Sequence, residues 1–445
     1  MSQYLGARAE NIPWKTIAIV FLLSLAARLV AFVLMLDFVE PDQMLASTPD
    51  VRNYVAAAEA IREQLNFHSD RMHIFGPGFP VFLALLQSIT LDPRFIVVVQ
   101  ILIASVSSAL VVDIAWQLTK RPAIALVAGT LHALSIASIA LSNILLSDTL
   151  YFGLLAAGLS FYLRGLRTNR LAFFLPAAVF LGISPLVRAV GLYFFLPLIF
   201  ITLVWTWPNK GETWKQVRSR LALPAACLLA GLVIIGSWLF RDKTPEEPRL
   251  AYSTHSAMFK LISQTRSRVN GTTYEAEYAL LHKDIDSARP LYGNLFYGAL
   301  VVVAPREMGE VAVEHPFSLA RSILTNAWVN CNNSRDHLHD SFPRMRPKLD
   351  SFRRDLDSTG LQYRATLFTL LGLILLIRFR AYRTALILAA ITGYFAIMSG
   401  FTLDQGNRIY YPGMIGWSVL CAVPVVAVVN KLISLRQSRV KSQAA

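Results

Sequence analysis

The chain has 445 residues, of which 55% are hydrophobic, and its formal net charge is +14 at pH 7. Several apolar stretches reach about 20 residues, the length that crosses a bilayer as a helix, which excludes a water-soluble globular protein. Three widely separated cysteines exclude a disulfide framework and a cysteine metal site.

Ten apolar stretches are predicted to cross the membrane. Backbone polar groups in lipid must be satisfied within their own segment, so each stretch is expected to be a helix. The first is too long for a cleavable signal peptide and lacks a small-residue cleavage pattern after it. The ten are Trp14–Leu36, Phe95–Leu118, Ala123–Leu141, Thr149–Tyr162, Leu171–Val187, Gly191–Trp207, Leu221–Phe240, Leu361–Ile377, Thr384–Gly400 and Ile409–Val429.

A further apolar segment, Pro77–Leu91, is short and contains two prolines. We expect a re-entrant or interfacial helix there, and a short true span is the alternative. With ten spans and a cytoplasmic N-terminus, most cations of the short loops fall on the cytoplasmic side, as the positive-inside rule requires. Counting Pro77–Leu91 as a span would move Lys120 and Arg121 outside. The positive charge then faces anionic headgroups and does not indicate nucleic-acid binding.

The chain divides into three predicted parts. Residues 1–240 form an N-terminal transmembrane module whose outer loop is 37–94, and residues 361–445 form C-terminal helices with a cytoplasmic tail. Between them, residues 241–360 are polar and nearly neutral and are expected outside the cytoplasm. Two short apolar pieces in this part, Leu295–Val303 and Phe317–Val329, could add two spans.

Carboxylates and arginines gather at the predicted outer ends of separate helices. They are Asp50, Asp148, Arg188, Arg241 and Arg408. A carboxylate can act as general base toward a hydroxyl, and arginines can hold a phosphate. The alternative is that Asp50 and Asp148 only cap helices and that Arg408 only anchors a span end among headgroups. The cluster makes a purely structural subunit a poor explanation.

Seven segments carry a family resemblance, and they occur in order over nearly the whole chain. The first span, which contains Arg28, is followed by PDVRNYVAAAEAI, HIFGPGFPVFLALL, LLSDTLYFGLL, LGISPLVRAVGLYFFLPL, WLFRDK…YSTHS, EHPFSLARSIL and NRIYYPGMIGWSVL. Together they resemble the GT-C fold glycosyltransferases, which include protein O-mannosyltransferases and the aminoarabinose transferase acting on lipid A. Arg28 itself is expected to be structural, with a partner inside the bundle.

The resemblance implies a fold and a reaction. The fold would be an all-α polytopic GT-C-like bundle of about 10–12 transmembrane helices, with outer juxtamembrane helices and a mainly helical extracytoplasmic region. The reaction would be inverting transfer of a hexosyl or pentosyl group from a polyprenyl-phosphate carrier to a glycan, lipid or protein hydroxyl. The location would be a bacterial cytoplasmic (inner) membrane, with the site facing the periplasm. The partners would be that donor, its acceptor and membrane lipids, but not nucleic acid.

The resemblance also assigns roles to single residues. It makes Asp50 the catalytic base and Asp148 a second acidic residue that assists the acceptor, the donor or a metal. No cofactor is required, although two carboxylates could hold one divalent cation. Donor-phosphate binding is assigned to Arg188, Arg241, Arg408 and His73, and substrate binding to Tyr54 and Tyr411.

Three positions depart from the family pattern. Gly76 stands where many relatives carry a basic residue, and Ala189 replaces a proline after Arg188. Val51 follows Asp50, so the Asp-Glu pair of the protein mannosyltransferases is absent. A protein O-mannosyltransferase proper is therefore disfavoured.

Two other functions compete with glycosyl transfer. A lipid-linked-sugar flippase would need polar residues at mid-membrane depth and broken helices in paired halves, whereas the charges here cluster at one face. A glycan polymerase or ligase would rely on arginines and a histidine of the outer region, such as Arg335 and His315. The sequence does not identify the sugar or the acceptor.

Overall fold

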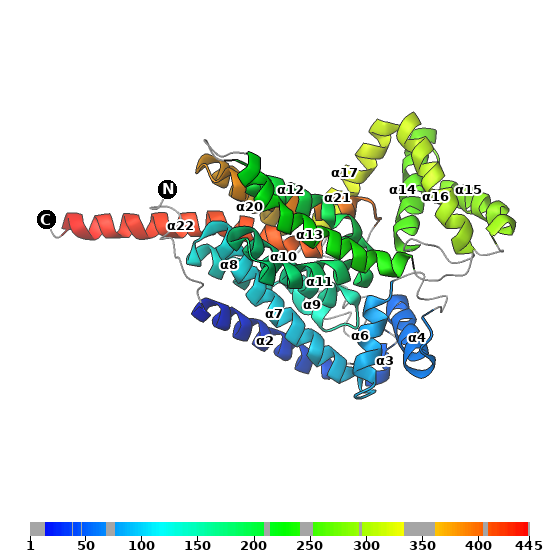
Figure 1. The fold of residues 1–445 in the computed structure, drawn as a ribbon, viewed down its shortest axis with the longest axis horizontal. Coiled ribbons are helices and arrows are strands. Elements are labelled where there is room, and N and C mark those ends of the chain that lie inside the picture. Colours follow the sequence, from blue (N-terminus) through cyan, green and yellow to red (C-terminus); the bar gives the residue numbers. More distant parts are fainter. Residues whose placement is uncertain are drawn as a thin grey trace.

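The computed structural model describes residues 14–37, 39–45, 47–67, 76–208, 214–240, 252–292, 296–332, 361–403 and 408–443. Over these ranges every regular element is a helix, as predicted. Figure 1 shows an elongated bundle from one end of which short helices and a separate helical group project.

The N-terminal part of the bundle is built on α7 and α10. The helix α2 packs along α7, and α10 lies between α7 and α11. Three short helices, α3, α4 and α6, lie together at one end of the bundle (Figure 1). The elements of this part are α2 (Trp14–Leu36), α3 (Pro41–Leu45), α4 (Pro49–Gln64), α6 (Gly78–Gln87), α7 (Pro93–Thr119), α8 (Pro122–Ala133), α9 (Ile136–Ser142), α10 (Ser147–Thr168), α11 (Leu171–Val187), η1 (Ala189–Phe194), α12 (Phe195–Thr206) and α13 (Trp214–Leu239).

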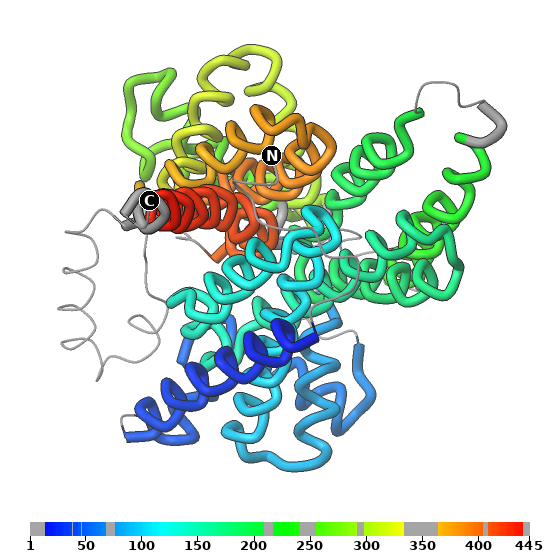
Figure 2. Tube along the Cα trace, turned by 90° about the vertical axis from the view of Figure 1, so that its left-hand side faces the viewer, coloured from blue at the N-terminus to red at the C-terminus, as the bar shows by residue number. Residues whose placement is uncertain are grey.

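The remaining helices form a projecting group and a second part of the bundle. In Figure 2 the first helices, blue, lie at the bottom and the projecting group, green to yellow, lies at the top. That group has its own apolar core around Phe259, Ile262 and Leu281. The elements are α14 (Tyr252–Asn270), α15 (Tyr274–Ala288), η2 (Arg289–Tyr292), α16 (Phe296–Glu314), α17 (Pro316–Asn332), α20 (Leu361–Arg378), α21 (Tyr382–Gly400), η5 (Tyr411–Gly413) and α22 (Met414–Gln443).

All ten predicted spans lie on helices, but the helices at Leu171–Val187 and Leu361–Ile377 are not among those long and apolar enough to cross a membrane. Among the described residues, seven helices are long and apolar enough to cross a membrane, or eight if one bent pair counts as a span. The bent pair is α8 and α9, which meet at 53°, so the segment predicted as a span over Ala123–Leu141 is broken into two helices. The seven are Trp14–Leu36, Pro93–Thr119, Ser147–Thr168, Ala189–Thr206, Val217–Leu239, Tyr382–Gly400 and Tyr411–Ser438.

The shorter apolar segments do not form such spans. Pro77–Leu91 contains α6, whose 10 residues extend about 15 Å, half the hydrocarbon thickness of a bilayer. Leu295–Val303 and Phe317–Val329 belong to α16 and α17, neither of which is among the helices long and apolar enough to cross. The predicted boundaries near 240 and 360 stay predictions, because 241–251 and 333–360 lie outside the described residues.

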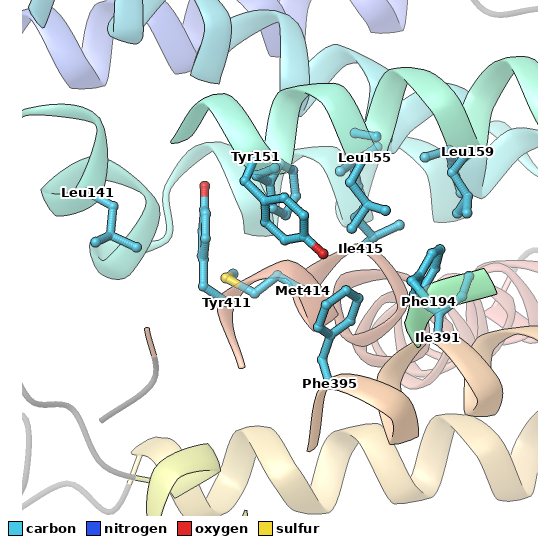
Figure 3. Close-up of a cluster of buried hydrophobic side chains, with 14 of the residues drawn as sticks. Leu141, Tyr151, Leu155, Leu159, Phe194, Ile391, Phe395, Tyr411, Met414 and Ile415 are labelled. Carbon is cyan, nitrogen blue, oxygen red and sulfur yellow. The ribbon is translucent and has the colours of Figure 1, made fainter. Parts of the chain in front are cut away.

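The core of the bundle joins α10 to the C-terminal helices. Figure 3 shows Tyr151 and Leu155 of α10 facing Tyr411 and Ile415 of the η5–α22 segment, all of them fully buried. Apolar side chains gain little by leaving lipid, so close packing and small residues have to hold such helices together. At Gly372 of α20 a Cβ atom would lie only 1.9 Å from the carbonyl oxygen of Leu420, so glycine is required where α20 meets α22.

Candidate active site

Asp50 lies in the first turn of α4, beside the bundle. Thr48 is the N-cap, and its Oγ1 accepts a hydrogen bond of 3.2 Å from the backbone N of Val51. Pro49 follows at the start of the helix, a position where its missing N–H costs nothing. The capping alternative for Asp50 is therefore wrong, and its carboxylate, 33% exposed, points into a cavity.

Asp148 lies in the first turn of α10 and is 1% exposed. The N-cap is Leu146, which makes no side-chain cap bond, so capping by Asp148 is wrong as well. The preceding link is held in place because Gln100 Nε2 donates to the carbonyl oxygen of Ile144 at 2.8 Å. This bond holds the start of α10, and with it the buried carboxylate of Asp148, in place.

Arg408 bridges the two carboxylates. Its Nη1 donates to Asp50 Oδ2 at 2.7 Å, and its Nε donates to Asp148 Oδ2 at 2.9 Å. Burial alone would lower the pKa of Arg408, but Asp148 and Asp50 more than offset this and raise it, so the guanidinium stays charged. Its side chain is only 12% exposed, which rules out a simple anchor among headgroups.

Arg188 and Tyr54 complete the polar wall. Arg188 follows α11 in extended backbone, and its Nη1 forms an ion pair with Asp148 Oδ1. The Tyr54 hydroxyl lies 3.1 Å from Ser147 Oγ. Burial raises the pKa of Tyr54 to about 12, so this phenol stays neutral at physiological pH and can offer a hydrogen bond.

Asp50, Tyr54, Arg188 and Arg408 line a cavity of about 610 Å³. Within the described part of the chain, Asp50 is the one carboxylate on its wall, whereas Asp148 lies behind the wall and contacts Arg188 and Arg408. Three cations face the same hollow: Arg188, Arg408 and Lys260. The rest of the wall is largely apolar and includes Val190, Tyr193, Leu196, Met398 and Phe401.

Lys260 was not predicted as a site residue. It belongs to α14, which begins with the YSTHS of the segment WLFRDK…YSTHS, and its position one helical turn after that segment was the signal. Asp50, Asp148, Arg188, Arg408 and Tyr54 come together as a group, from four separate parts of the chain. The predicted donor-binding residues His73 and Arg241 lie outside the described residues.

Tyr411 is placed differently from the prediction. It is 1% exposed and does not line the cavity, so its position does not support contact with substrate. Its hydroxyl lies 2.9 Å from Ser138 Oγ, which accepts a 2.5 Å hydrogen bond from Nη2 of Arg28. Arg28 also donates to the carbonyl oxygen of Ala133 at 2.9 Å, so it has the partners expected of a buried arginine. This network fixes η5, which begins three residues after Arg408.

Gly76 and Gly78, in the segment HIFGPGFPVFLALL, explain one departure from the family pattern. Gly76 has φ +65°, and a Cβ there would lie 2.8 Å from the carbonyl oxygen of Leu186. At Gly78 a Cβ would lie 2.8 Å from the backbone N of Val187. This segment therefore packs backbone to backbone on the end of α11, beside Arg188, and leaves no room for a basic side chain at position 76.

The carboxylates as arranged do not suit a shared metal ion. Asp50 and Asp148 both contact the Arg408 guanidinium, which supplies positive charge between them. Where the chain is described, no group of three or more His, Cys, Asp or Glu side chains could hold a metal ion. A bridging divalent cation would have to displace Arg408 from two charged hydrogen bonds.

The fold matches that of solved membrane glycosyltransferases. No protein-family model matches the chain, and no curated protein matches it. One similar structure is the archaeal oligosaccharyltransferase AglB from Archaeoglobus fulgidus, in complex with an inhibitory peptide and a dolichol-phosphate. The similarity covers 97% of this chain and 52% of the AglB chain, with a TM-score of 0.53 and 14% sequence identity. A second structure of the A. fulgidus enzyme, with Zn and sulfate, gives TM-score 0.51, 14% identity and coverages of 95% and 51%. The chain thus spans about half the length of these archaeal structures.

ArnT from Cupriavidus metallidurans bound to undecaprenyl phosphate is also similar, at TM-score 0.36 and 15% identity, over 89% of this chain and 77% of its own. The fold of this chain is the GT-C fold of polytopic membrane glycosyltransferases, as the resemblance implied.

Proposed function

We propose that the chain is an inverting glycosyltransferase that moves a sugar from a polyprenyl-phosphate carrier to a hydroxyl acceptor. The observation that carries this proposal is Asp50, a partly exposed carboxylate on the wall of a cavity that three cations also face. A base and a phosphate-binding surface in one hollow are what such a transfer needs. The GT-C fold supports this class of reaction.

In the proposed mechanism, the acceptor hydroxyl donates a hydrogen bond to Asp50. Its oxygen attacks C1 of the sugar and its proton passes to the carboxylate, while the bond between C1 and the phosphate oxygen breaks. The electron pair of that bond leaves with the polyprenyl phosphate. A single displacement of this kind inverts the anomeric centre. Arg188, Arg408 and Lys260 stabilise the charge on the departing phosphate.

Asp148 has a supporting role in this proposal. It contacts Arg188 and Arg408 but does not line the cavity, so it orients the two guanidinium groups rather than touching substrate. A donor phosphate would compete with Asp50 for Arg408, and its arrival would leave Asp50 freer to accept the proton of the acceptor. Charge placement and orientation would then supply most of the rate enhancement.

The donor class and the location belong to the same proposal. The AglB structure contains a dolichol-phosphate, which supports a polyprenyl-type carrier for a chain of this fold. The apolar wall of the cavity suits the hydrophobic isoprenoid chain of the carrier. The acceptor is a glycan, a lipid or a secreted protein, at the outer face of a bacterial cytoplasmic membrane.

The test compares cells that lack the gene and carry either the wild type or Asp50→Asn at matched expression. Asp92→Asn is the matched control, because Asp92 is an exposed aspartate that caps α7, where asparagine caps equally well. Mass spectrometry of surface glycans, lipid A and secreted glycoproteins would identify the sugar and the acceptor.

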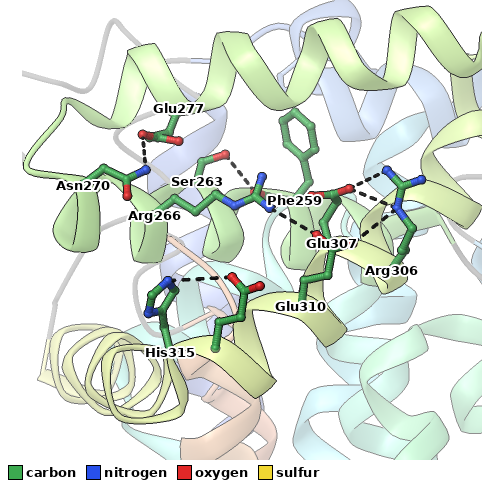
Figure 4. A network of polar contacts seen from close by, with 10 residues as sticks. Phe259, Ser263, Arg266, Asn270, Glu277, Arg306, Glu307, Glu310 and His315 are labelled. Atoms are coloured by element: carbon green, nitrogen blue, oxygen red, sulfur yellow. Dashed lines mark hydrogen bonds and ion pairs between the residues drawn. The ribbon is translucent and has the colours of Figure 1, made fainter.

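We expect one sugar mass to be restored by the wild type and by Asp92→Asn but not by Asp50→Asn. Full restoration by Asp50→Asn would remove this carboxylate from the chemistry and reject the mechanism. His315→Ala belongs in the same experiment, because a polymerase or ligase would depend on a histidine of the outer region. His315 (labelled in Figure 4) is partly exposed, pairs with Glu314 and does not line the cavity, so we expect no effect.

A further inference from the structure

The helix α17 has an inverted distribution of side chains. Its buried residues are all polar: Ser322, Asn326, Asn330 and Asn332. Large apolar residues are exposed instead, Phe317 at 89% and Leu324 at 66%. A helix of a water-soluble domain turns its apolar face inward and its polar face outward, and α17 does the reverse.

The two kinds of side chain lie on opposite faces of α17. At about 100° per residue, Phe317, Leu324 and Trp328 project within about 40° of one another. Asn326 projects in the opposite direction, about 180° from Phe317. Arg321 is the only charged residue of α17, and it lies on the apolar face, from which a long arginine side chain can reach phospholipid headgroups.

The polar face of α17 is bonded to neighbouring helices. Asn326 Nδ2 donates to Gln264 Oε1 of α14 at 2.8 Å, and Gln264 Nε2 donates back to Asn326 Oδ1 at 2.9 Å. Asn330 Nδ2 donates to the carbonyl oxygen of Ser399 in α21 at 2.8 Å. Polar contacts of this kind join helices in a membrane, where apolar side chains gain little by leaving lipid.

The position of α17 also favours contact with lipid. Figure 1 shows α17 next to α21, whereas α14, α15 and α16 lie farther out along the long axis of the bundle. The helix α21 is long and apolar enough to cross a membrane. Thr366 Oγ1 of α20 donates to Asn332 Oδ1 at 2.7 Å, and Leu367 and Leu371, which follow on α20, are exposed. Exposed apolar surface therefore continues from α20 onto the end of α17.

We propose that the face of α17 formed by Phe317, Leu324 and Trp328 lies in the membrane, against the phospholipids around the cavity end of the bundle. The 17 residues of α17 extend about 26 Å, and the helix lies in the leaflet without crossing it. Tryptophan and arginine on such a face suit the boundary between acyl chains and headgroups.

This contact has a consequence for the candidate active site. Gln264, which bonds to α17, follows Lys260 by one turn of α14, and Lys260 lines the cavity. The membrane would then help to hold this wall of the cavity at the level of the headgroups. The lipid contact itself does not depend on the proposed reaction.

The test uses the purified full-length chain in nanodiscs of phosphatidylethanolamine and phosphatidylglycerol. Its own cysteines are first replaced by alanine: Cys227, Cys331 and Cys421. A nitroxide label is then attached to Leu324→Cys. Leu203→Cys, at an exposed leucine of a membrane-spanning helix, is the reference for lipid, and Leu280→Cys, at an exposed leucine of α15, is the reference for water. Electron paramagnetic resonance measures collisions of each label with molecular oxygen, which concentrates in lipid, and with a water-soluble nickel complex.

We expect the label at Leu324→Cys to match the one at Leu203→Cys, with more collisions with oxygen than with the nickel complex. The opposite order, as expected at Leu280→Cys, would place this face in water and overturn the proposal. Few collisions with either reagent would show that protein covers the face, either residues 333–360 or a second copy of the chain, and would also reject lipid as the partner.

A second measurement uses the chain without substitutions. A phosphatidylcholine with a diazirine in its acyl chain, activated by light in the same nanodiscs, should label the peptides that contain Leu324 and Leu203 but not the one that contains Leu280. Labelling of the Leu203 peptide without the Leu324 peptide would overturn the proposal.

Discussion

Arg408 is the residue on which the arrangement of the two carboxylates depends. It donates to Asp50 and to Asp148, and Asp148 is almost completely buried. In Arg408→Gln, Asp148 would lose its ion pair with Arg408 and keep the one with Arg188. We expect a loss of about 3 kcal/mol in unfolding free energy, the usual result of removing one partner of a buried ion pair, and a fall of at least about 100-fold in transfer. Thermal unfolding in detergent and an activity assay on membranes measure the two effects.

The control for Arg408 is Arg94→Gln. Arg94 pairs with Asp92 at 2.7 Å, but both side chains are exposed, so neither stability nor transfer should change. If Arg408→Gln and Arg94→Gln behaved alike, the bridge would contribute nothing beyond an ordinary surface pair, and the proposed site would lose its organising residue.

The sequence predicted the charged residues of the site as a group, but not the place of each residue within it. Asp50, Asp148, Arg188 and Arg408 were predicted together because each follows or precedes an apolar stretch on the same side of the membrane. Which carboxylate faces the cavity depends on tertiary contacts, and no sequence pattern carries that information. Tyr411 was misplaced for the same reason, because its partner Ser138 lies 273 residues away.

At the scale of whole elements, the packing of α6 on the end of α11 positions Arg188. A Cβ at Gly78 would lie 2.6 Å from Val187 Cγ2 and 2.8 Å from the backbone N of Val187. In Gly78→Ala one of the two segments must therefore move, and overpacking of this kind costs about 1–3 kcal/mol. We expect transfer to fall roughly tenfold or more, because small displacements of positioning groups are costly in catalysis. Activity relative to the amount of folded protein is the measurement.

Gly393→Ala is the matched control, since Gly393 is also helical and an added Cβ there meets nothing within 4 Å. This change should be neutral or slightly stabilising, because alanine is the better helix former. Unchanged transfer in Gly78→Ala would show that α6 does not position Arg188.

The projecting helices carry a pH dependence of their own. Hydrogen bonds from Thr272 Oγ1 at 2.7 Å and Asn270 Nδ2 at 2.9 Å lower the pKa of Glu277 below its ordinary value of 4.5 (Figure 4 shows the Asn270 contact). A carboxyl group whose pKa is lowered in the folded state stabilises that state when the pH is above its unfolded-state pKa. This stability is lost as the pH falls from the unfolded-state pKa through the folded-state pKa. Circular-dichroism melts between about pH 6 and pH 3.5 should therefore show a smaller decline for Glu277→Gln than for wild type.

Glu275→Gln is the control for this prediction. Glu275 lies in the same first turn of α15 but is exposed. It should decline with pH as the wild type does. Identical curves for all three proteins would mean that Glu277 does not link the stability of α14 and α15 to pH.

For the molecule as a whole, length and hydropathy were sufficient to predict the helices but not their bends. Ala123–Leu141 is continuous in hydropathy, yet the helix breaks at Ser135, whose Oγ accepts a 3.4 Å hydrogen bond from the backbone N of Ser138. Arg28 reaches into the same break from another helix and bonds to Ala133 and Ser138. A break stabilised by a residue more than 100 positions away is invisible to any local pattern.

The orientation of the whole bundle follows from its charge and gives the last prediction. Arg121, Arg378, Arg380 and Arg383 gather at one end of the bundle, and the positive-inside rule predicts that this end lies in the cytoplasm. The candidate active site, at the other end, would then face outward. With Cys227, Cys331 and Cys421 replaced by alanine, single cysteines at the exposed positions Glu63 and Arg436 would report on the two ends.

A membrane-impermeant maleimide added to intact cells should label Glu63→Cys at once, because α4 lies at the same end as the cavity that contains Asp50. Arg436→Cys should react only after the membrane has been permeabilised. The reverse pattern would place Asp50 in the cytoplasm, where a carrier-linked sugar on the outer leaflet could not reach it, and the proposed donor would then be wrong even if Asp50 proved essential.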